Sequence, residues 1–172
     1  SRQIENKFRV EHNRSWAGFD LKVGAGAEEI KYETDEEDLR GPPTLDKRSY
    51  ITSLREFEYA GFASLNRSFF KEKVNLTAGL RLEGNTFNAS TANPLNQLSP
   101  KIALSYNFNE ALSLNASYSI YHQLPPFTAL GFRDTTGVLV NKDLQYITTS
   151  HYVAGFSYYL AWNAKISLEG FY

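Results

Sequence analysis

The chain has 172 residues, of which 12 are Phe, 11 Tyr and 2 Trp, and it contains neither Cys nor Met. Its 18 basic and 19 acidic residues nearly balance, which argues against a nucleic-acid binder, and the lack of Cys excludes disulfide frameworks and thiolate sites. No apolar run approaches the roughly 18 residues of a membrane-spanning helix, but membrane strands are not excluded, because alternating strands average to a hydrophilic composition. The chain lacks an initiator Met and a charged-then-apolar leader, so we expect a mature or excised segment.

Eight stretches of the chain alternate between apolar and polar residues with a period of two. In a strand, successive side chains point to opposite faces, so each stretch has one apolar and one polar face. In the clearest case, Val74, Leu76 and Leu80 share a face opposite Asn75 and Arg81. The eight predicted strands cover residues 4–11, 17–27, 56–65, 74–84, 98–108, 112–120, 151–160 and 164–172.

Three features favour a transmembrane barrel over a soluble β-sandwich. The stretches run about 9–11 residues, the length that a tilted strand needs to cross a bilayer. Their polar faces mix charged residues with Ser, Thr and Asn, as a wet lumen allows. Short turns near Asn13, Phe70, Asn109 and Ala161 alternate with long loops at 33–49, 86–97 and 122–146. We therefore predict an all-β, antiparallel up-and-down transmembrane β-barrel with periplasmic turns and extracellular loops.

Aromatic residues gather where these strands end. Those beside the short turns are predicted to form an interfacial girdle, although Phe and Tyr are also simply good strand formers. The predicted girdle residues are Trp16, Phe70, Phe108 and Trp162.

The direction of the strands indicates a slice of a larger barrel. The first predicted strand leads into a short turn and the eighth leaves one, so both ends of the chain are expected outside the cell. A complete bacterial barrel with an even number of strands begins and ends on the periplasmic side. We therefore expect residues 1–172 to form a partial barrel domain.

From about Tyr59 onward, the sequence contains short motifs in a characteristic order and spacing. They include Leu76-Thr77-Ala78-Gly79-Leu80-Arg81-Leu82, Leu98-Ser99-Pro100-Lys101, Leu114-Asn115-Ala116-Ser117-Tyr118, Gln123-Leu124-Pro125-Pro126-Phe127 and Leu168-Glu169-Gly170-Phe171-Tyr172. In these motifs, over roughly two thirds of the chain, the sequence resembles the barrel of TonB-dependent outer-membrane receptors.

The resemblance implies a 22-stranded barrel with a plugged lumen, of which eight strands are about a third. It implies a receptor in the bacterial outer membrane that imports a scarce nutrient, such as a ferric siderophore, cobalamin or a glycan, rather than an enzyme. Its partners would be outer-membrane lipid, the nutrient and an inner-membrane energy-coupling complex, with no nucleic acid and no cofactor. The plug, the coupling motif and the remaining strands are absent from this sequence.

The loop at 122–146 is the best candidate for contact with a ligand. Aromatic faces and an arginine suit anionic or ring-containing ligands, and loops this long are often functional. The alternative is that the loop packs against its neighbours and seals the rim. The candidate ligand-binding residues are Tyr121, His122, Phe127, Phe132 and Arg133.

Charged residues on the polar faces are expected to point into the lumen, where they could form charge ladders. Solvation and salt bridging are the structural alternative to acid–base chemistry, and we favour it. These residues are Glu58, Arg81, Glu83, Lys101, Lys165 and Glu169.

Neither the acidic run nor the histidines predict a metal site. The acidic run at 34–38 is better explained as a solvated loop than as a cation site, because it has no EF-hand spacing. His12, His122 and His151 are too scattered to predict a metal site.

Three further functions remain open at this stage. A passive porin or structural barrel would share the strand pattern, and an outer-membrane hydrolase would need a catalytic site in the lumen. A soluble β-sandwich that binds a ligand would also alternate.

Overall fold

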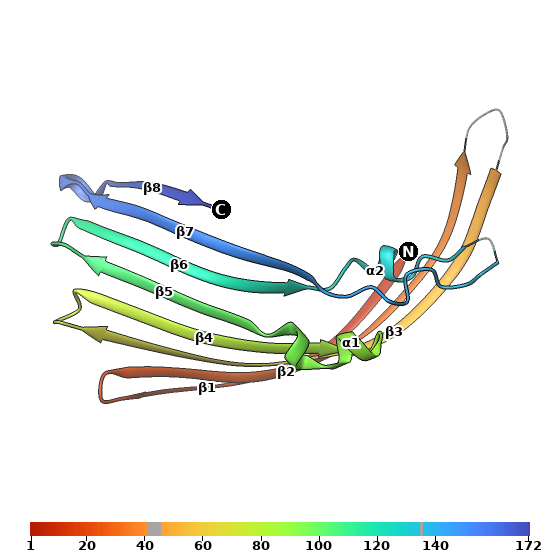
Figure 1. Ribbon diagram of the computed structural model, residues 1–172, viewed down its shortest axis with the longest axis horizontal. Helices are drawn as coiled ribbons and strands as arrows, with labels where there is room; N and C mark the ends of the chain where they lie inside the picture. The colour runs from red at the N-terminus through yellow and green to blue at the C-terminus, as the bar shows by residue number, and fades with distance from the viewer. Residues whose placement is uncertain (41–45, 135) are drawn as a thin grey trace.

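The computed structural model describes residues 1–40, 46–134 and 136–172, without the side chains of 36–40, 46–50 and 161. It is one antiparallel sheet of eight strands in which each strand pairs with its neighbours in the chain (Figure 1). Within the described residues, the first and last strands do not pair with each other, so the sheet is open. The strands are β1 (Arg2–Trp16), β2 (Phe19–Arg40), β3 (Asp46–Phe69), β4 (Val74–Asn85), β5 (Ser99–Asn107), β6 (Leu112–Gln123), β7 (Ile147–Tyr159) and β8 (Lys165–Phe171).

Short turns join β1 to β2, β3 to β4, β5 to β6 and β7 to β8 at one end of the sheet, and at the other end longer connections join β4 to β5 and β6 to β7 (Figure 1). The turn between β1 and β2 has positive φ at Ala17 (46°) and Gly18 (77°), as a two-residue hairpin turn requires. The longer connections contain the helices α1 (Ala89–Ala92), η1 (Pro94–Gln97) and α2 (Phe127–Leu130), and the turn before β8 contains η2 (Ala161–Asn163). In the described part of the chain, no helix is long and apolar enough to cross a membrane.

The predicted bounds of the first three strands are wrong. The predicted turn near Asn13 lies inside β1, and the actual turn follows Trp16. The predicted loop at 33–49 is largely strand, because β2 continues to Arg40 and β3 begins at Asp46. The predicted length of about 9–11 residues is therefore too short for these strands, which have 15, 22 and 24 residues. The ladder between β2 and β3 continues through Tyr32↔Leu54 and Thr34↔Thr52. The many charged residues of this stretch therefore did not indicate a loop.

The sheet has one apolar and one polar face along most of its length. The register aligns apolar side chains across strands, for example Leu65↔Ala78 and Ala78↔Ile102. Many of these side chains are uncovered, with Phe8 70% and Leu168 75% exposed. We call this apolar side the outward face and the opposite side the inner face. An outward face left bare by protein is what a barrel strand presents to lipid.

The two faces exchange polarity at Ala27 of β2. Before this point the odd-numbered residues of β2 are apolar and face outward; beyond it the outward positions are Glu29, Lys31 and Glu33. The inward positions become apolar instead, since Ile30 and Tyr32 are both 4% exposed. The apolar band on the outward face therefore ends at this level, and β2 and β3 project beyond it.

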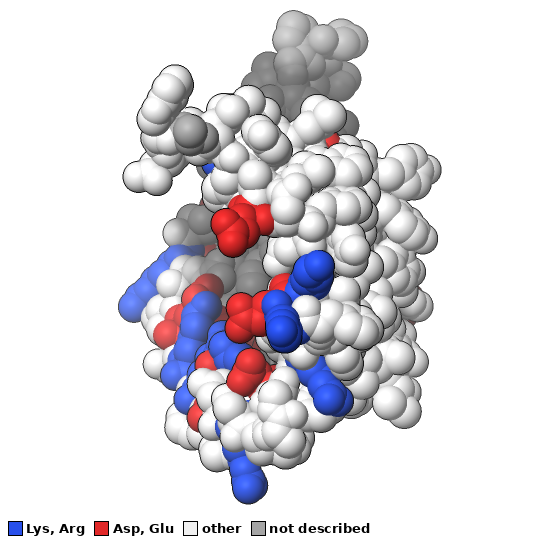
Figure 2. Space-filling view, turned by 90° about the vertical axis from the view of Figure 1, so that its left-hand side faces the viewer, with Lys and Arg blue, Asp and Glu red and all other residues white. Residues whose placement is uncertain are grey.

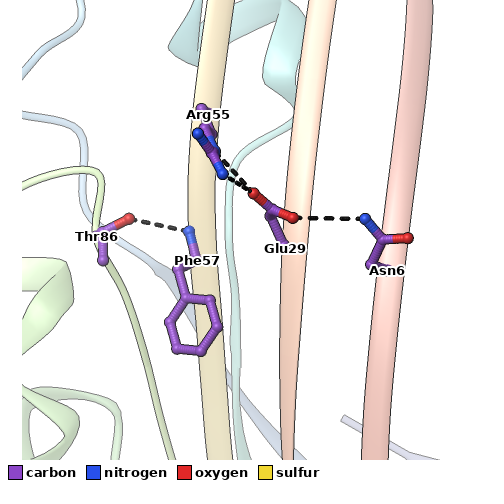
Figure 3. Close-up of polar contacts among 5 residues, drawn as sticks. All are labelled: Asn6, Glu29, Arg55, Phe57 and Thr86. Carbon is purple, nitrogen blue, oxygen red and sulfur yellow. Dashed lines mark hydrogen bonds and ion pairs between the residues drawn. The ribbon is translucent and has the colours of Figure 1, made fainter.

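Polar contacts on the outward face mark the end of the apolar band (Figure 3). The Arg55 guanidinium donates through Nε to Glu29 Oε1 at 2.7 Å, and Asn6 Nδ2 donates to Glu29 Oε2 at 3.4 Å, so one carboxylate links β1, β2 and β3. Beside them, Thr86 extends the ladder one residue past β4: its hydroxyl accepts from Phe57 N at 2.9 Å, and its own N–H donates to Phe57 O at 3.1 Å.

Candidate functional site

The connection between β6 and β7, residues 124–146, turns back across the sheet toward β2 and β3 (Figure 1). We call this segment the β6–β7 loop. It begins with Pro125 and Pro126, which favour an extended backbone, and Pro126 precedes the single turn of α2. The hydrogen bond from Thr52 of β3 to Gly131 places the loop against the inner face, where β2 and β3 project beyond the apolar band.

Side chains of α2 fill the apolar part of this inner face. Leu130 is fully buried, and the Phe127 ring stacks on Tyr32 of β2 with 5.7 Å between the ring centroids. Ile30, Tyr32 and Leu130 are the only buried hydrophobic residues among those described, so the small core of this chain is the junction between the loop and the sheet.

A hydrogen-bonded latch fastens the loop to β3. The hydroxyl of Thr52, which is fully buried, donates to Gly131 O at 2.5 Å and accepts from Arg133 Nε at 3.1 Å. A Cβ at Gly131 would lie 2.6 Å from Thr52 Cγ2 and 3.0 Å from Phe127 O, so only glycine allows this approach. The latch is thus specified by Thr52, Gly131 and Arg133.

Beyond the latch, the loop forms a small folded-back turn around Asp134. Its carboxylate accepts from Thr136 Oγ1 at 2.7 Å and from the N–H groups of Thr136 and Val138, both at 2.9 Å. The hydroxyl of Thr136 and then the Val138 N–H hold the pKa of the Asp134 carboxyl below its ordinary value. Arg133 Nη1 donates to Gly137 O at 2.8 Å, so the turn also holds the arginine of the latch.

The connection between β4 and β5 supports the far end of the β6–β7 loop. Asn88 caps α1 by accepting from Thr91 N at 2.9 Å, and its amide nitrogen donates to Leu144 O at 2.8 Å and Lys142 O at 3.2 Å. One side chain therefore orders both connections at this end of the sheet.

A hollow of about 210 Å³ lies on the inner face beside the end of the loop. Charged side chains from β1, β2 and β4 line it, with ion pairs between Lys7 and Glu28 at 3.0 Å and between Arg81 and Glu83 at 2.8 Å. Figure 2 shows charged side chains of both signs gathered in a hollowed region, next to a broad surface without charge. The hollow therefore brings cations and carboxylates of three strands together.

Tyr146 brings the β6–β7 loop into this hollow. Burial, and then the charges of Glu58 and Glu83, raise the pKa of the Tyr146 phenol. A tyrosine phenol is protonated at neutral pH, so Tyr146 can donate a hydrogen bond into the hollow.

The five candidate ligand-binding residues divide into two groups. Phe127 and Arg133 engage the inner face of β2 and β3 as described, and Phe132 beside them is half-buried. On β6, His122 Nδ1 lies 2.9 Å from Ser99 Oγ, and Tyr121 meets the ring of His151 edge-on at 5.1 Å. Arg133 and Phe127 thus contact strands β2 and β3, and the assignment of these residues to a ligand stays a prediction.

The six candidate lumen charges share the inner face by register, from Glu58 on β3 to Glu169 on β8. Glu58, Arg81 and Glu83 line the hollow; Lys101 is exposed on β5, and Lys165 on β8 lies over the Tyr159 ring at 5.5 Å. The sequence analysis did not single out Lys7, Glu28 or Tyr146. The alternation of the first two strands already placed Lys7 on a polar face, but Tyr146 had no local signal.

Other sequence predictions are placed by the structure as follows. Trp16, Phe70, Phe108 and Trp162 all lie at the short-turn end and are exposed. The backbone of the acidic run belongs to β2, whereas the side chains of 36–38 lie outside the described residues. Within the described part of the chain, no group of three His, Cys, Asp or Glu residues is placed to hold a metal ion.

The bare outward face, charged inner face, short turns and long opposite loops together define a segment of a transmembrane β-barrel. The family model described as "TonB dependent receptor-like, beta-barrel" matches residues 1–172, so the chain belongs to the TonB-dependent receptor family. It is therefore part of an outer-membrane protein of Gram-negative bacteria.

Solved structures show the same fold at low sequence identity. The copper transporter OprC matches with a TM-score of 0.68 and 15% identity over 98% of this chain. A mutant of the ferric enterobactin receptor PfeA from Pseudomonas aeruginosa gives 0.70 and 18%, and the alcaligin receptor FauA from Bordetella pertussis gives 0.57 and 18%, each over 98%. The chain spans only 29%, 26% and 28% of these three proteins, respectively. Comparison with curated protein sequences found no match.

Proposed function

We propose that the protein containing this chain imports a scarce nutrient across the outer membrane and that the TonB complex of the inner membrane drives this import. The β6–β7 loop carries the proposal, because it folds inward over the inner face and brings Tyr146 to the charged hollow. We further propose that residues 1–172 form part of one barrel domain, completed by further strands and a plug in the parent protein.

The inward loop favours a gated receptor over a passive porin. Here a loop of more than 20 residues is latched onto the inner face by Thr52 and Arg133, which places defined structure on the side where a receptor binds its cargo. Long loops with defined internal structure often serve binding. The buried contacts of Leu130 hold this loop in one place, which gives a ligand a preformed surface.

The hollow supports a ligand with anionic oxygen atoms. Lys7 and Arg81 supply cationic donors, each of which also pairs with a carboxylate of the hollow, and Tyr146 supplies a neutral hydroxyl donor. At about 210 Å³ the hollow is smaller than the roughly 300–1,000 Å³ of ordinary ligand pockets, so we propose that it forms one wall of a larger site.

Among ferric siderophores, cobalamin and glycans, we favour a ferric siderophore as the cargo. Two of the similar structures are named as receptors of a ferric siderophore or of alcaligin, and a third as a copper transporter. The family consists of receptors and transporters, and we propose no enzymatic role.

Uptake of radioactive iron by cells with and without the full-length parent gene tests this proposal. We expect siderophore-bound iron to accumulate only with the gene, and accumulation to stop when an uncoupler removes the proton-motive force. Uptake that survives the uncoupler would indicate a passive pore instead. Tyr146→Phe should weaken binding of the imported chelate, whereas Arg55→Gln, a change on the outward face, should not.

A further inference from the structure

Four basic residues lie at the short-turn end of the sheet, far along the strands from the β6–β7 loop. They are Arg14 on β1 and Arg67 on β3, and Lys71 and Lys73 in the turn that follows β3. We call these four residues the interfacial basic cluster. Arg14 pairs in register with Leu21, and Arg67 pairs with Phe19, so both arginines belong to the lipid-facing side.

Two aromatic rings hold the Arg67 side chain. Its guanidinium carbon lies 4.1 Å from the centroid of the Phe19 ring and 4.9 Å from that of Phe69. The Trp16 ring stacks on Phe19 at 5.8 Å and extends this aromatic surface to β1. A guanidinium held against ring faces is attracted to them while the N–H groups at its edge stay available.

The cluster lacks a carboxylate partner. None of its four residues makes an ion pair with any residue that the structure describes, and the Arg67 side chain makes no hydrogen bond to these residues. The nearest acidic residue in β2, Asp20, has inner-face parity and accepts a hydrogen bond from Ser15 at 2.5 Å. Glu72 is the single acidic residue in the turn with the two lysines. The outward surface here carries an uncompensated positive charge.

The position of the cluster identifies its partner. The apolar outward face extends from Leu21, Leu65 and Leu76 toward Ala27, so Arg67 lies at the boundary of this face near the short turns. Short turns of outer-membrane barrels face the periplasm, and this boundary is therefore the headgroup level of the inner leaflet. Phosphate groups of phospholipids are at that depth, and arginine binds phosphate through two parallel hydrogen bonds.

We propose that the interfacial basic cluster is a binding site for the phosphodiester headgroup of an anionic phospholipid in the inner leaflet, with Arg67 as the principal ligand. Phe19 and Phe69 fix the guanidinium before the lipid arrives, which lowers the entropic cost of binding. Lys71 and Lys73 add charge that favours an anionic over a zwitterionic headgroup. This site is independent of the cargo and of TonB coupling.

Native mass spectrometry of the purified full-length receptor tests the proposal, with phosphatidylglycerol titrated into the detergent solution. We expect a bound phosphatidylglycerol that Arg67→Gln weakens on the order of tenfold, as loss of a charge-assisted contact implies. Arg67→Lys keeps the charge but loses the planar donor pair, and should be intermediate. Arg55→Gln is the matched control, since Arg55 is also an outward-face arginine but pairs with Glu29 at the opposite end, and it should bind as the wild type does.

Heat-modifiable migration on a gel verifies that each variant is folded. If Arg67→Gln does not fold, Phe69→Leu removes one ring while keeping an apolar side chain, and should weaken phosphatidylglycerol binding about threefold. Equal lipid retention by the folded variants and the wild type would overturn the proposal. So would equal losses in Arg55→Gln, stronger binding of lipopolysaccharide than of phosphatidylglycerol, or full competition by millimolar inorganic phosphate, which would indicate a site for free anions.

Discussion

Gly131→Ala should loosen the β6–β7 loop from β3. The new Cβ would lie 2.6 Å from Thr52 Cγ2, 3.0 Å from Phe127 O and 3.3 Å from Leu54 Cδ1, so either the loop or the strand has to shift. Thr52 is in the ladder of β3 and can move little, whereas the loop is held at few points. Overpacking of this kind costs about 1–3 kcal/mol, which corresponds to an opening of the loop that is roughly 5 to 150 times more frequent.

Amide hydrogen exchange in the purified full-length receptor measures this opening. The informative amides are those of Asp134 and Val140, which donate within the loop to Val138 O at 3.0 Å and Phe132 O at 3.1 Å. Their exchange should accelerate in Gly131→Ala, because local opening exposes them while the barrel stays folded. Amides in the middle of β6 should keep their wild-type rates.

Two variants control for the cause of the effect. Gly61→Ala adds the same methyl group to β3 where the nearest atom outside its chain neighbours, Gly24 O, is 3.9 Å away, so it should leave the loop unchanged. Adding Thr52→Ser to Gly131→Ala removes the methyl group that collides and keeps the hydroxyl, and should restore part of the protection. Wild-type exchange in Gly131→Ala, or no recovery in the double variant, would refute the steric explanation.

Three further predictions concern single polar side chains. Thr52→Val should raise the same exchange rates, since it leaves Gly131 O without its buried donor at a cost of about 1–3 kcal/mol. The Asp134 carboxyl should titrate below its ordinary pKa of 3.8 when followed through the Thr136 amide shift in NMR. Its contribution to loop stability is therefore fully present above pH 3.8 and is lost as the pH falls through the lowered pKa. Glu56→Gln should raise the melting temperature at pH 7, because Glu56 is only 7% exposed and has no cationic partner among the described residues.

Each of these predictions has a clear contrary outcome. Protection unchanged in Thr52→Val would mean that Leu130 and Phe127 alone hold the loop. A midpoint at or above 3.8 would show that the bonds to the Asp134 carboxylate are not formed in solution. A lower melting temperature in Glu56→Gln would show that the buried carboxylate, which accepts from Thr86 Oγ1 at 3.0 Å, contributes more than its charge costs.

Strand alternation predicted the fold correctly where every second side chain of a strand faces lipid. The predicted strand at 74–84 agrees with β4, Val74–Asn85, and the predicted all-β antiparallel barrel class is confirmed, with the sheet open in this chain. Alternation was a poor guide to the strand bounds where the environment of the side chains changes along one strand. Ile30 and Tyr32 continue the period-two pattern of β2 with the opposite phase, and the interruption at Glu28–Glu29 concealed that the strand goes on.

The site was less predictable than the fold because its contacts are distant in sequence. Arg133 was singled out by residue type, but its partner Thr52 is 81 positions away, and nothing local to either residue indicates the contact. The need for glycine at 131 comes from the approach of β3 rather than from a turn, since its φ of −85° is open to any residue. Lys7 was on the polar face of its predicted strand, whereas Glu28 lies just beyond the predicted strand at 17–27, and only the register showed that the two form an ion pair.

The exchange of polarity at Ala27 sets how deep the β2–β3 hairpin sits. Sliding the hairpin inward by one pair of residues would carry Glu29 and Arg55 into hydrocarbon, and sliding it outward would expose apolar residues to water. The exchange of polarity along β2 and β3 therefore fixes the depth at which this hairpin sits in the membrane. Residues added beyond it lengthen the projection without changing the membrane crossing, so this hairpin can vary in reach while the barrel wall beneath it stays the same.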